Sequence, residues 1–313
     1  MAITTLLGDC IDIEDQITNN SIDLLLTDPP YNISTDGAKP VWIDKHTGQD
    51  KNSIHSQKFS ESFDQDWDDV GHEEFLVQMT TWSSMWYKKI RKGGSFAVFI
   101  SDQYISYLWN IMEQTGFEPK RIWTWKKPAA VPFNRSVNPV SACEYILWGI
   151  KPGGKRTFNS NAGADTIVER YSAADKISSI IYKLAKEPGA LNNLNRLFEQ
   201  ARKESAKMLV SRKTSQGLIE CVIPNTIVYS GGLGKGKIHP TEKPVELLEY
   251  FVSLLSNPGD SVLDTFAGSG STGTACYNLG RSCTLIERDA KMYDKMMLRI
   301  STLTSLESTG LFQ

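Results

Sequence analysis

A carboxylate, two prolines and an aromatic ring follow one another at the end of a short apolar segment. The segment Ile22–Thr27 reads IDLLLT, and Asp28-Pro29-Pro30-Tyr31 comes directly after it. Such a run predicts a buried strand, which must end here because proline cannot donate to a sheet ladder. The prolines then present the Asp28 carboxylate, the Pro29 carbonyl and the Tyr31 ring rigidly at one edge of the sheet. Two such acceptors suit an exocyclic amino group and the ring suits a stacked base; an ordinary Asp-Pro turn is the alternative.

A glycine-rich turn near the C-terminus follows another apolar strand. Residues 264–272 read DTFAGSGST, the end of a strand, a turn and the start of a helix. Glycines allow a positive φ and a close backbone approach, so a ligand can lie against the turn and the helix N-terminus. Glu287 ends the next strand, where an acidic side chain commonly binds both hydroxyls of a ribose. A nucleoside ligand is therefore predicted; the alternative is a tight turn followed by a surface Glu.

A third motif, residues 239–244 (HPTEKP), opens a predicted helix. Thr241 and the free N–H groups of that helix end are suited to a carboxylate, and Lys243 adds positive charge. A Thr cap with Pro in the first turn explains the same residues, so both interpretations stay open from this motif alone.

Charge is unevenly distributed along the 313 residues. The formal net charge is −2, yet residues 151–237 hold 15 Lys and Arg against 7 Asp and Glu. A basic segment within an acidic protein is typical of a phosphate-binding module attached to a catalytic body. A solvated helical face is an equally good alternative on charge alone.

Composition excludes several classes of protein. With 40% hydrophobic and 22% charged residues, the chain is expected to fold as one large domain or two small ones. Five scattered cysteines form no CxxC pair, which argues against a disulfide framework and a zinc site. No apolar run reaches the ~18–20 residues of a membrane span, and the N-terminus lacks a signal-peptide pattern. A cytoplasmic protein without a metal is therefore expected.

The hydrophobic pattern predicts alternating strands and helices, and therefore an α/β fold. Gly93-Gly94 is expected to end the first long helix, residues 35–69 to form a long polar loop, and residues 176–209 to be mostly helical. Strands are expected near the N-terminus and at 22–27, 95–101, 121–126, 144–150, 261–266 and 282–287. Helices are expected at 73–90, 103–114, 272–279, between Pro244 and Pro258, and from Ala290 onward.

In this order along the chain, the motifs resemble those of amino-group DNA methyltransferases of the circularly permuted beta group, which use S-adenosylmethionine. That family has a DPPY-type motif early, a target-recognition region in the middle, and HPTxKP and FxGxG motifs late. Residues 8–10 (GDC), 143–151 (CEYILWGIK) and 287–289 (ERD) match further family features. The resemblance covers most of the chain outside residues 35–69 and 157–235.

The resemblance implies a Rossmann-like class I methyltransferase sheet, seven-stranded, mostly parallel and permuted in chain order. Residues 1–156 and 236–313 would form the catalytic domain, and residues 157–235 an inserted, mainly helical target-recognition region. Double-stranded DNA would be the partner. Basic side chains of the insert would mainly contact phosphates, among them Arg196, Arg202, Lys203, Lys207, Arg212 and Lys213.

The resemblance also implies roles for the motif residues. Asp28, Pro29, Pro30 and Tyr31 would be catalytic: Tyr31 stacks on a flipped base, while Asp28 and the Pro29 carbonyl accept its amino hydrogens and orient the nitrogen toward the sulfonium methyl. No metal or covalent intermediate is required. The implied cofactor is S-adenosyl-L-methionine, with Asp9 and Cys10 near the adenine and Glu287 on the ribose. Phe266, Gly268 and Gly270 would lie along the nucleoside and methionine, and Asp264 and Thr272 belong to the same glycine turn. Thr241 and Lys243 would bind the methionine carboxylate.

Adenine N6 is the expected target, because family members with Asp at position 28 are mostly adenine-directed and cytosine-N4 enzymes usually have Ser there. Two other classes stay open: a catalytically silent DNA-binding protein and a protein-glutamine methyltransferase. Intact Asp28, Tyr31, Gly268 and Glu287 argue against the first, and Asp in place of Asn argues against the second. A bacterial or phage-encoded enzyme is implied, with a homodimer and a cognate restriction nuclease as partners to test.

Overall fold

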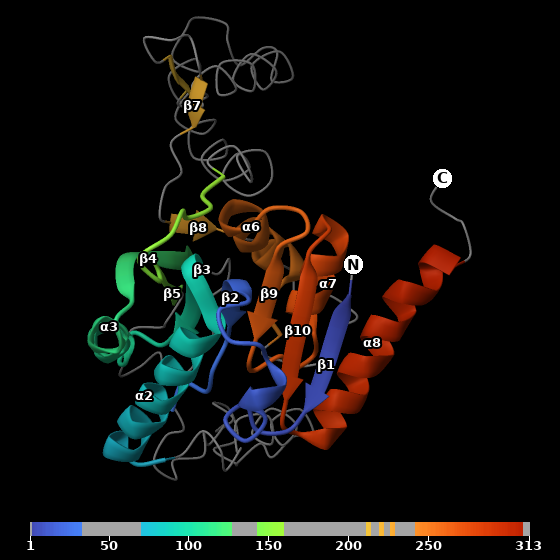
Figure 1. Cartoon of the computed structure of the whole chain (residues 1–313), viewed down its shortest axis with the longest axis horizontal. Helices are drawn as coiled ribbons and strands as arrows, with labels where there is room; N and C mark the ends of the chain where they lie inside the picture. The colour runs from blue at the N-terminus through green and yellow to red at the C-terminus, as the bar shows by residue number, and fades with distance from the viewer. Residues whose placement is uncertain are drawn as a thin grey trace, which may run out of the picture.

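The computed structural model describes residues 2–32, 70–126, 143–159, 211–213, 219–221, 226–228 and 242–308, with only the backbone for the three short segments and for residues 304–308. These residues build a mixed sheet with helices on both faces (Figure 1). Its eight strands lie in the order β1-β10-β9-β2-β3-β5-β4-β8. In the described part of the chain, no helix is long and apolar enough to cross a membrane.

The strands of this sheet are β1 (Ile3–Leu7), β2 (Ile22–Thr27), β3 (Ile90–Ile100), β4 (Glu118–Lys126), β5 (Cys143–Ile150), β8 (Thr226–Val228), β9 (Ser261–Asp264) and β10 (Ser282–Glu287). The helices are the 3-10 turn η1 (Glu14–Gln16), α2 (His72–Lys89), α3 (Ile105–Thr115), α6 (Val245–Leu255), α7 (Ser271–Leu279) and α8 (Ala290–Ser308). Strands β6 (Ser211–Lys213) and β7 (Ile219–Cys221) form a separate antiparallel pair.

All neighbouring strands of the large sheet are parallel except at β5, which runs antiparallel to both β3 and β4. The seven strands that lie from β1 to β4 in this spatial order confirm the predicted sheet. In it, strands from the N-terminal and C-terminal parts of the chain lie side by side. Strand β8 adds an eighth strand beside β4. It belongs to the region expected to be a mainly helical insert, and the described elements of that region are strands instead; residues 176–209 lie outside the described residues.

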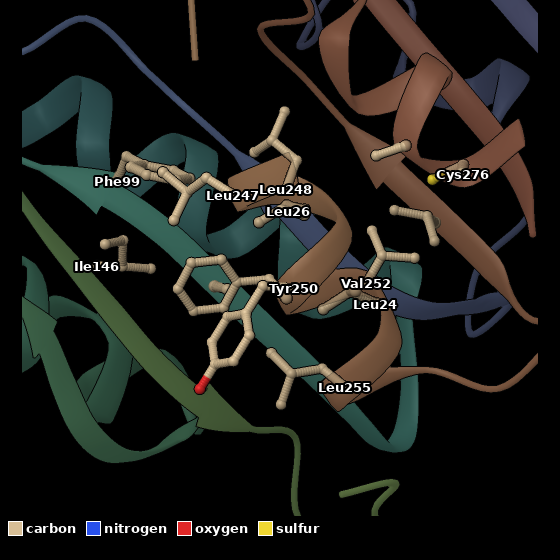
Figure 2. Close-up of a cluster of buried hydrophobic side chains, with 14 of the residues drawn as sticks. Leu24, Leu26, Phe99, Ile146, Leu247, Leu248, Tyr250, Val252, Leu255 and Cys276 are labelled. Carbon is tan, nitrogen blue, oxygen red and sulfur yellow. The ribbon is translucent and has the colours of Figure 1, made fainter. Parts of the chain in front are cut away.

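The central strands are apolar on both faces because helices cover both. In β2, Leu24 and Leu26 pack on the face covered by α6, whereas Leu25 packs on the face covered by α2. Figure 2 shows the first of these clusters, where Leu24 and Leu26 lie among Leu247, Leu248 and other side chains of α6. This burial explains why the sequence of β2 is a continuous apolar run rather than an alternating one.

The expected end of the first long helix at Gly93-Gly94 is wrong. Helix α2 ends at Lys89, and both glycines lie within β3, where the pairing with β2 shifts its register. Gly93 has φ +80°, and a Cβ there would lie 2.5 Å from the Lys155 carbonyl oxygen. The glycines therefore allow a β-bulge and a close backbone approach, a long-range requirement that the local pattern does not contain.

The carboxyl ends of β1, β2, β9 and β10 meet at one edge of the sheet, so the loops after these strands lie close together. Strand β5 runs in the opposite direction, and its Tyr145 pairs with Ile100 at the end of β3. The beginning of β5, including Glu144, therefore lies at this same edge. The fold thus places residues from both ends and from the middle of the chain around one site.

Candidate active site

The Asp28 carboxylate, just after β2, is held from two sides. Lys243 Nζ donates to Asp28 Oδ2 at 2.6 Å, and the Tyr31 hydroxyl donates to Asp28 Oδ1 at 2.7 Å. Glu144 contacts both of these partners, since its Oε2 lies 3.2 Å from Lys243 Nζ and 3.4 Å from the Tyr31 hydroxyl. These four side chains, here called the Asp28 cluster, form a closed ring of polar contacts.

Burial sets the electrostatics of the Asp28 cluster. The Lys243 side chain is 9% exposed and that of Asp28 is 29% exposed. Burial raises the pKa of Asp28 against the influence of the Lys243 ammonium, and Glu144 acts in the same direction as burial. Burial alone would lower the pKa of Lys243, but the charges of Asp28 and Glu144 outweigh it and raise that pKa. Burial and the two carboxylates raise the pKa of Tyr31, so its hydroxyl remains a donor.

The structure gives Lys243 different neighbours from those expected. Lys243 was expected at the cofactor carboxylate, whereas its described partners are Asp28 and Glu144. Its ammonium also lies 5.2 Å from the ring centroids of Tyr31 and Phe99. Glu144 was missed as a site residue. The sequence shows only a single acid at the start of a mostly apolar strand. That position lies at the site only because β5 runs antiparallel to β3.

The motif after β2 is anchored on both sides. Pro29 is buried and Pro30 is half-buried. Asn32 has φ +51°, its side-chain amide donates to the Tyr104 hydroxyl at 3.0 Å, and its Oδ1 accepts from the Val70 N–H at 3.0 Å. These contacts tie the end of the motif to the start of α3 and to Val70, two residues before α2. No role was predicted for Asn32 from the sequence.

The glycine turn and Glu287 form the second part of the site. The Gly268 N–H donates to Glu287 Oε2 and the Asp289 N–H donates to Oε1, both at 2.8 Å. Burial raises the pKa of Glu287, but each carboxylate oxygen retains a lone pair for a further donor. Gly268 has φ +52°, and a Cβ there would meet nothing within 4 Å. A held carboxylate beside open space fits the ribose hydroxyls of a nucleoside.

Asp264 and Thr272 are placed differently from the prediction that they bind the cofactor directly. They are only 3% and 4% exposed. Asp264 Oδ1 accepts from the Thr27 hydroxyl at 2.8 Å and from the Phe266 N–H at 3.1 Å, and its Oδ2 accepts from the Thr272 hydroxyl at 2.6 Å. Burial raises the pKa of Asp264 to about 6 despite these donors. The two side chains therefore shape the turn from beneath.

Gly270 has a structural requirement that Gly268 lacks. It has φ +79° and precedes the first residue of α7. A Cβ there would lie 2.8 Å from Met296 Cγ of α8. Gly270 therefore allows the turn to pack against α8.

The loop after β1 completes this part of the edge. The Gly8 N–H donates to the Glu287 carbonyl at 3.0 Å, and Asp9 Oδ1 accepts from the Ile11 N–H at 2.9 Å. Cys10 is 3% exposed, and burial, aided by the Asp9 charge, raises the pKa of its thiol to about 12. Phe266 packs edge to face on Trp82, with ring centroids 4.9 Å apart. Asp9, Phe266 and Glu287 thus gather at one edge, with Cys10 in the apolar layer below.

Several predicted residues cannot be placed. Thr241, Arg196, Arg202, Lys203 and Lys207 lie outside the described residues, and Arg212 and Lys213 are described only as backbone of β6. Within the described ranges, no three His, Cys, Asp or Glu side chains are grouped so that they could hold a metal ion.

The fold is that of a methyltransferase, as shown by the order of the strands, the antiparallel β5 and the glycine turn after β9. The solved M1.HpyAVI–SAM complex shares this fold with a TM-score of 0.53 at 20% identity, covering 95% of this chain and 98% of that one. A family model described as DNA methylase, of the N6/N4 group, matches residues 22–298. The chain belongs to this N6/N4 DNA methylase family.

Two relatives are similar in sequence. The type II methyltransferase M.HinfI of Haemophilus influenzae is 29% identical over 296 residues, which are 93% of this chain and 66% of that protein. The type II methyltransferase M1.MboII of Moraxella bovis is 28% identical over 273 residues, 87% of this chain and 86% of that protein. The predicted family, fold class and S-adenosyl-L-methionine cofactor are confirmed.

Substitution of Gly268 tests the open space beside the turn. Gly259 is a matched control, because it too has a positive φ, +88°, and a Cβ there meets nothing within 4 Å. Gly268→Ala and Gly259→Ala should each lower the free energy of unfolding by ~1–2 kcal/mol. Only Gly268→Ala should also weaken S-adenosylmethionine binding, by on the order of tenfold, as measured by calorimetry. Equal affinities in the two variants would contradict this placement of the ligand.

Removal of the Thr272 hydroxyl tests its support of the buried Asp264. Thr272→Val should cost ~1.5–3 kcal/mol of unfolding free energy, since it deletes a hydrogen bond to a charged group. Thr274→Val is the control, because that hydroxyl makes only a 3.4 Å contact to the carbonyl of Gly270, just before the same helix.

This loss should depend on pH in a defined direction. Asp264 is ionised above its pKa of about 6 and takes up a proton below it. The Thr272 donor stabilises the ionised form, so the loss in Thr272→Val should be largest above pH 6 and smaller near pH 5. Denaturant titrations at several pH values measure it, and a loss independent of pH would exclude the proposed support.

Proposed function

We propose that this chain is a site-specific DNA methyltransferase that transfers a methyl group from S-adenosyl-L-methionine to N6 of a flipped adenine. The observation that carries the proposal is the Asp28 carboxylate, which is paired with Lys243 at 2.6 Å, still 29% exposed, and at the same sheet edge as the glycine turn and Glu287. The methyl donor supplies an electrophilic methyl group on a sulfonium. The protein must then hold the target nitrogen in line with it.

Asp28 and the Pro29 carbonyl would accept the two hydrogens of the target amino group. Each Asp28 oxygen receives one hydrogen bond within the protein and can accept another. Positive charge develops on the target nitrogen during transfer, and a fixed carboxylate nearby stabilises it. The Lys243 ammonium lies over the Tyr31 ring, so base stacking on Tyr31 would use the opposite face.

Around the methyl donor, Glu287 would take the ribose hydroxyls and Gly268 would allow close approach. Asp9 and Phe266 would border the adenine and the nucleoside, while Asp264 and Thr272 would hold the turn in shape. The same residues that bind the donor thus place it beside Asp28.

The residue at position 28 is the basis for the proposed target atom. Asp28 favours adenine N6 through the family resemblance, and cytosine N4 is the second candidate because the matched family includes both groups. A silent DNA-binding protein is disfavoured by the paired, partly exposed Asp28 beside an intact glycine turn.

The basic region would supply DNA recognition. We assign it to residues 157–235, between the two parts of the catalytic domain, on the basis of its positive charge and its place in the family order. Its basic side chains would contact phosphates, and the type II relatives support a role beside a restriction nuclease. A homodimer is a further expectation of this proposal.

Asp28→Ala tests the catalytic assignment. It should reduce methyl transfer at least ~10²–10³-fold, because a positioned charge-stabilising group is lost. Affinity for S-adenosylmethionine should stay within about threefold, which would preserve most of the binding free energy. Transfer of labelled methyl to unmethylated DNA and calorimetry measure the two quantities.

The nucleoside formed by the unaltered protein identifies the target. Digested product DNA should contain N6-methyladenine. N4-methylcytosine would favour the second candidate, and label found only in protein would overturn DNA methylation as the activity.

A further inference from the structure

Lys243 bridges two carboxylates that come from separate strands. Asp28 follows β2, Glu144 begins β5, and β3 lies between these strands in the sheet. The ammonium lies 5.2 Å from the centroid of the Phe99 ring of β3. Lys243 thus joins two carboxylates that come from the strands on either side of β3.

Glu144 touches each of the two side chains that hold Asp28. It lies 3.2 Å from the Lys243 ammonium and 3.4 Å from the Tyr31 hydroxyl, while Lys243 and Tyr31 bind opposite oxygens of Asp28. The orientation of the Asp28 carboxylate is therefore set by two donors whose own positions depend on one acid. Glu144 is 16% exposed. Two carboxylates are both acceptors, so Glu144 acts on Asp28 through the two donors rather than by a hydrogen bond of its own.

We propose that Glu144 is a positioning residue for methyl transfer, which orients Asp28 through Lys243 and Tyr31 and keeps the Asp28 cluster negatively charged toward the target amino group. With Glu144 present, one ammonium is shared between two carboxylates. Without its charge, Lys243 would neutralise Asp28 alone and draw its carboxylate away from the substrate. This inference rests on the proposed function, in which Asp28 accepts the amino hydrogens.

The effect of Glu144 on Asp28 should also appear in the pH dependence of the methyl-transfer rate. Among the described residues, the charged and titratable groups that face Asp28 are Lys243, Tyr31, Glu144 and, more remotely, Asp264. The Glu144 charge raises the pKa of Asp28, so removing it should lower that pKa. Since transfer requires ionised Asp28, the acid limb of the rate profile should move to lower pH.

Three variants separate positioning from simple loss of stability. Glu144→Gln removes the charge and keeps the shape, and Glu144→Asp keeps the charge on a shorter side chain. Asp23→Asn is the matched control: Asp23 is 18% exposed, pairs with Arg91 at 2.5 Å and accepts from the Ser261 N–H at 2.9 Å. It lies at the start of β2, at the opposite edge of the sheet from the Asp28 cluster.

The measurements are the single-turnover rate on unmethylated DNA, the affinity for S-adenosylmethionine by calorimetry, and thermal unfolding. Glu144→Gln should lower the rate by on the order of tenfold to a hundredfold with affinity within about threefold, and its acid limb should shift. Glu144→Asp should recover part of the rate. Asp23→Asn should lose stability but keep the rate of the unaltered protein.

An unchanged rate in Glu144→Gln, or a lower rate with an unmoved acid limb, would overturn the inference while leaving the proposed function intact. If the unaltered protein transfers no methyl group to DNA, the proposed function itself fails. The two failures are therefore distinguished by the unaltered protein.

Discussion

The buried Asp264 carboxylate is the interaction on which the two halves of the site depend. It accepts from Thr27, the residue just before Asp28, and from Phe266 and Thr272 in the glycine turn. The motif after β2 and the glycine turn after β9 lie at opposite ends of the sequence, and this side chain links the ends of the two paired strands. A carboxylate with three neutral donors tolerates such burial only while those donors remain in place.

The Asp264 and Asp28 carboxylates are stabilised in different ways, and the difference suits the roles proposed for them. Asp264 is surrounded by hydroxyl and amide donors inside the fold, so it organises structure. Asp28 is paired with an ammonium, remains partly exposed and belongs to a cluster of two carboxylates and one ammonium. In the proposed reaction positive charge moves from sulfur to nitrogen, and a prearranged negative cluster beside the nitrogen would lower the cost of that movement.

The direction of a single strand extends the site. Because β5 is antiparallel, its first residues face the edge at which the parallel strands end, and Glu144 joins residues that follow β2 and precede α6. The same sheet continues through β4 to β8, which comes from the middle of the chain. The region proposed to recognise DNA is thereby attached to the catalytic sheet by a strand.

The sequence by itself determined most of the strands and helices of the sheet, and the order of the motifs. Continuous apolar runs such as Ile22–Thr27 require burial on both faces, and the motifs at 28–31, 264–272 and 287 were identified correctly at strand ends because glycine, proline and acid patterns there are local. Only the tertiary structure decided the partners. The bulge at Gly93, the burial of Asp264 and Thr272, and the Lys243 bridge between Asp28 and Glu144 all depend on contacts between residues distant in sequence, and a local pattern carries no information about which distant strand will lie beside it.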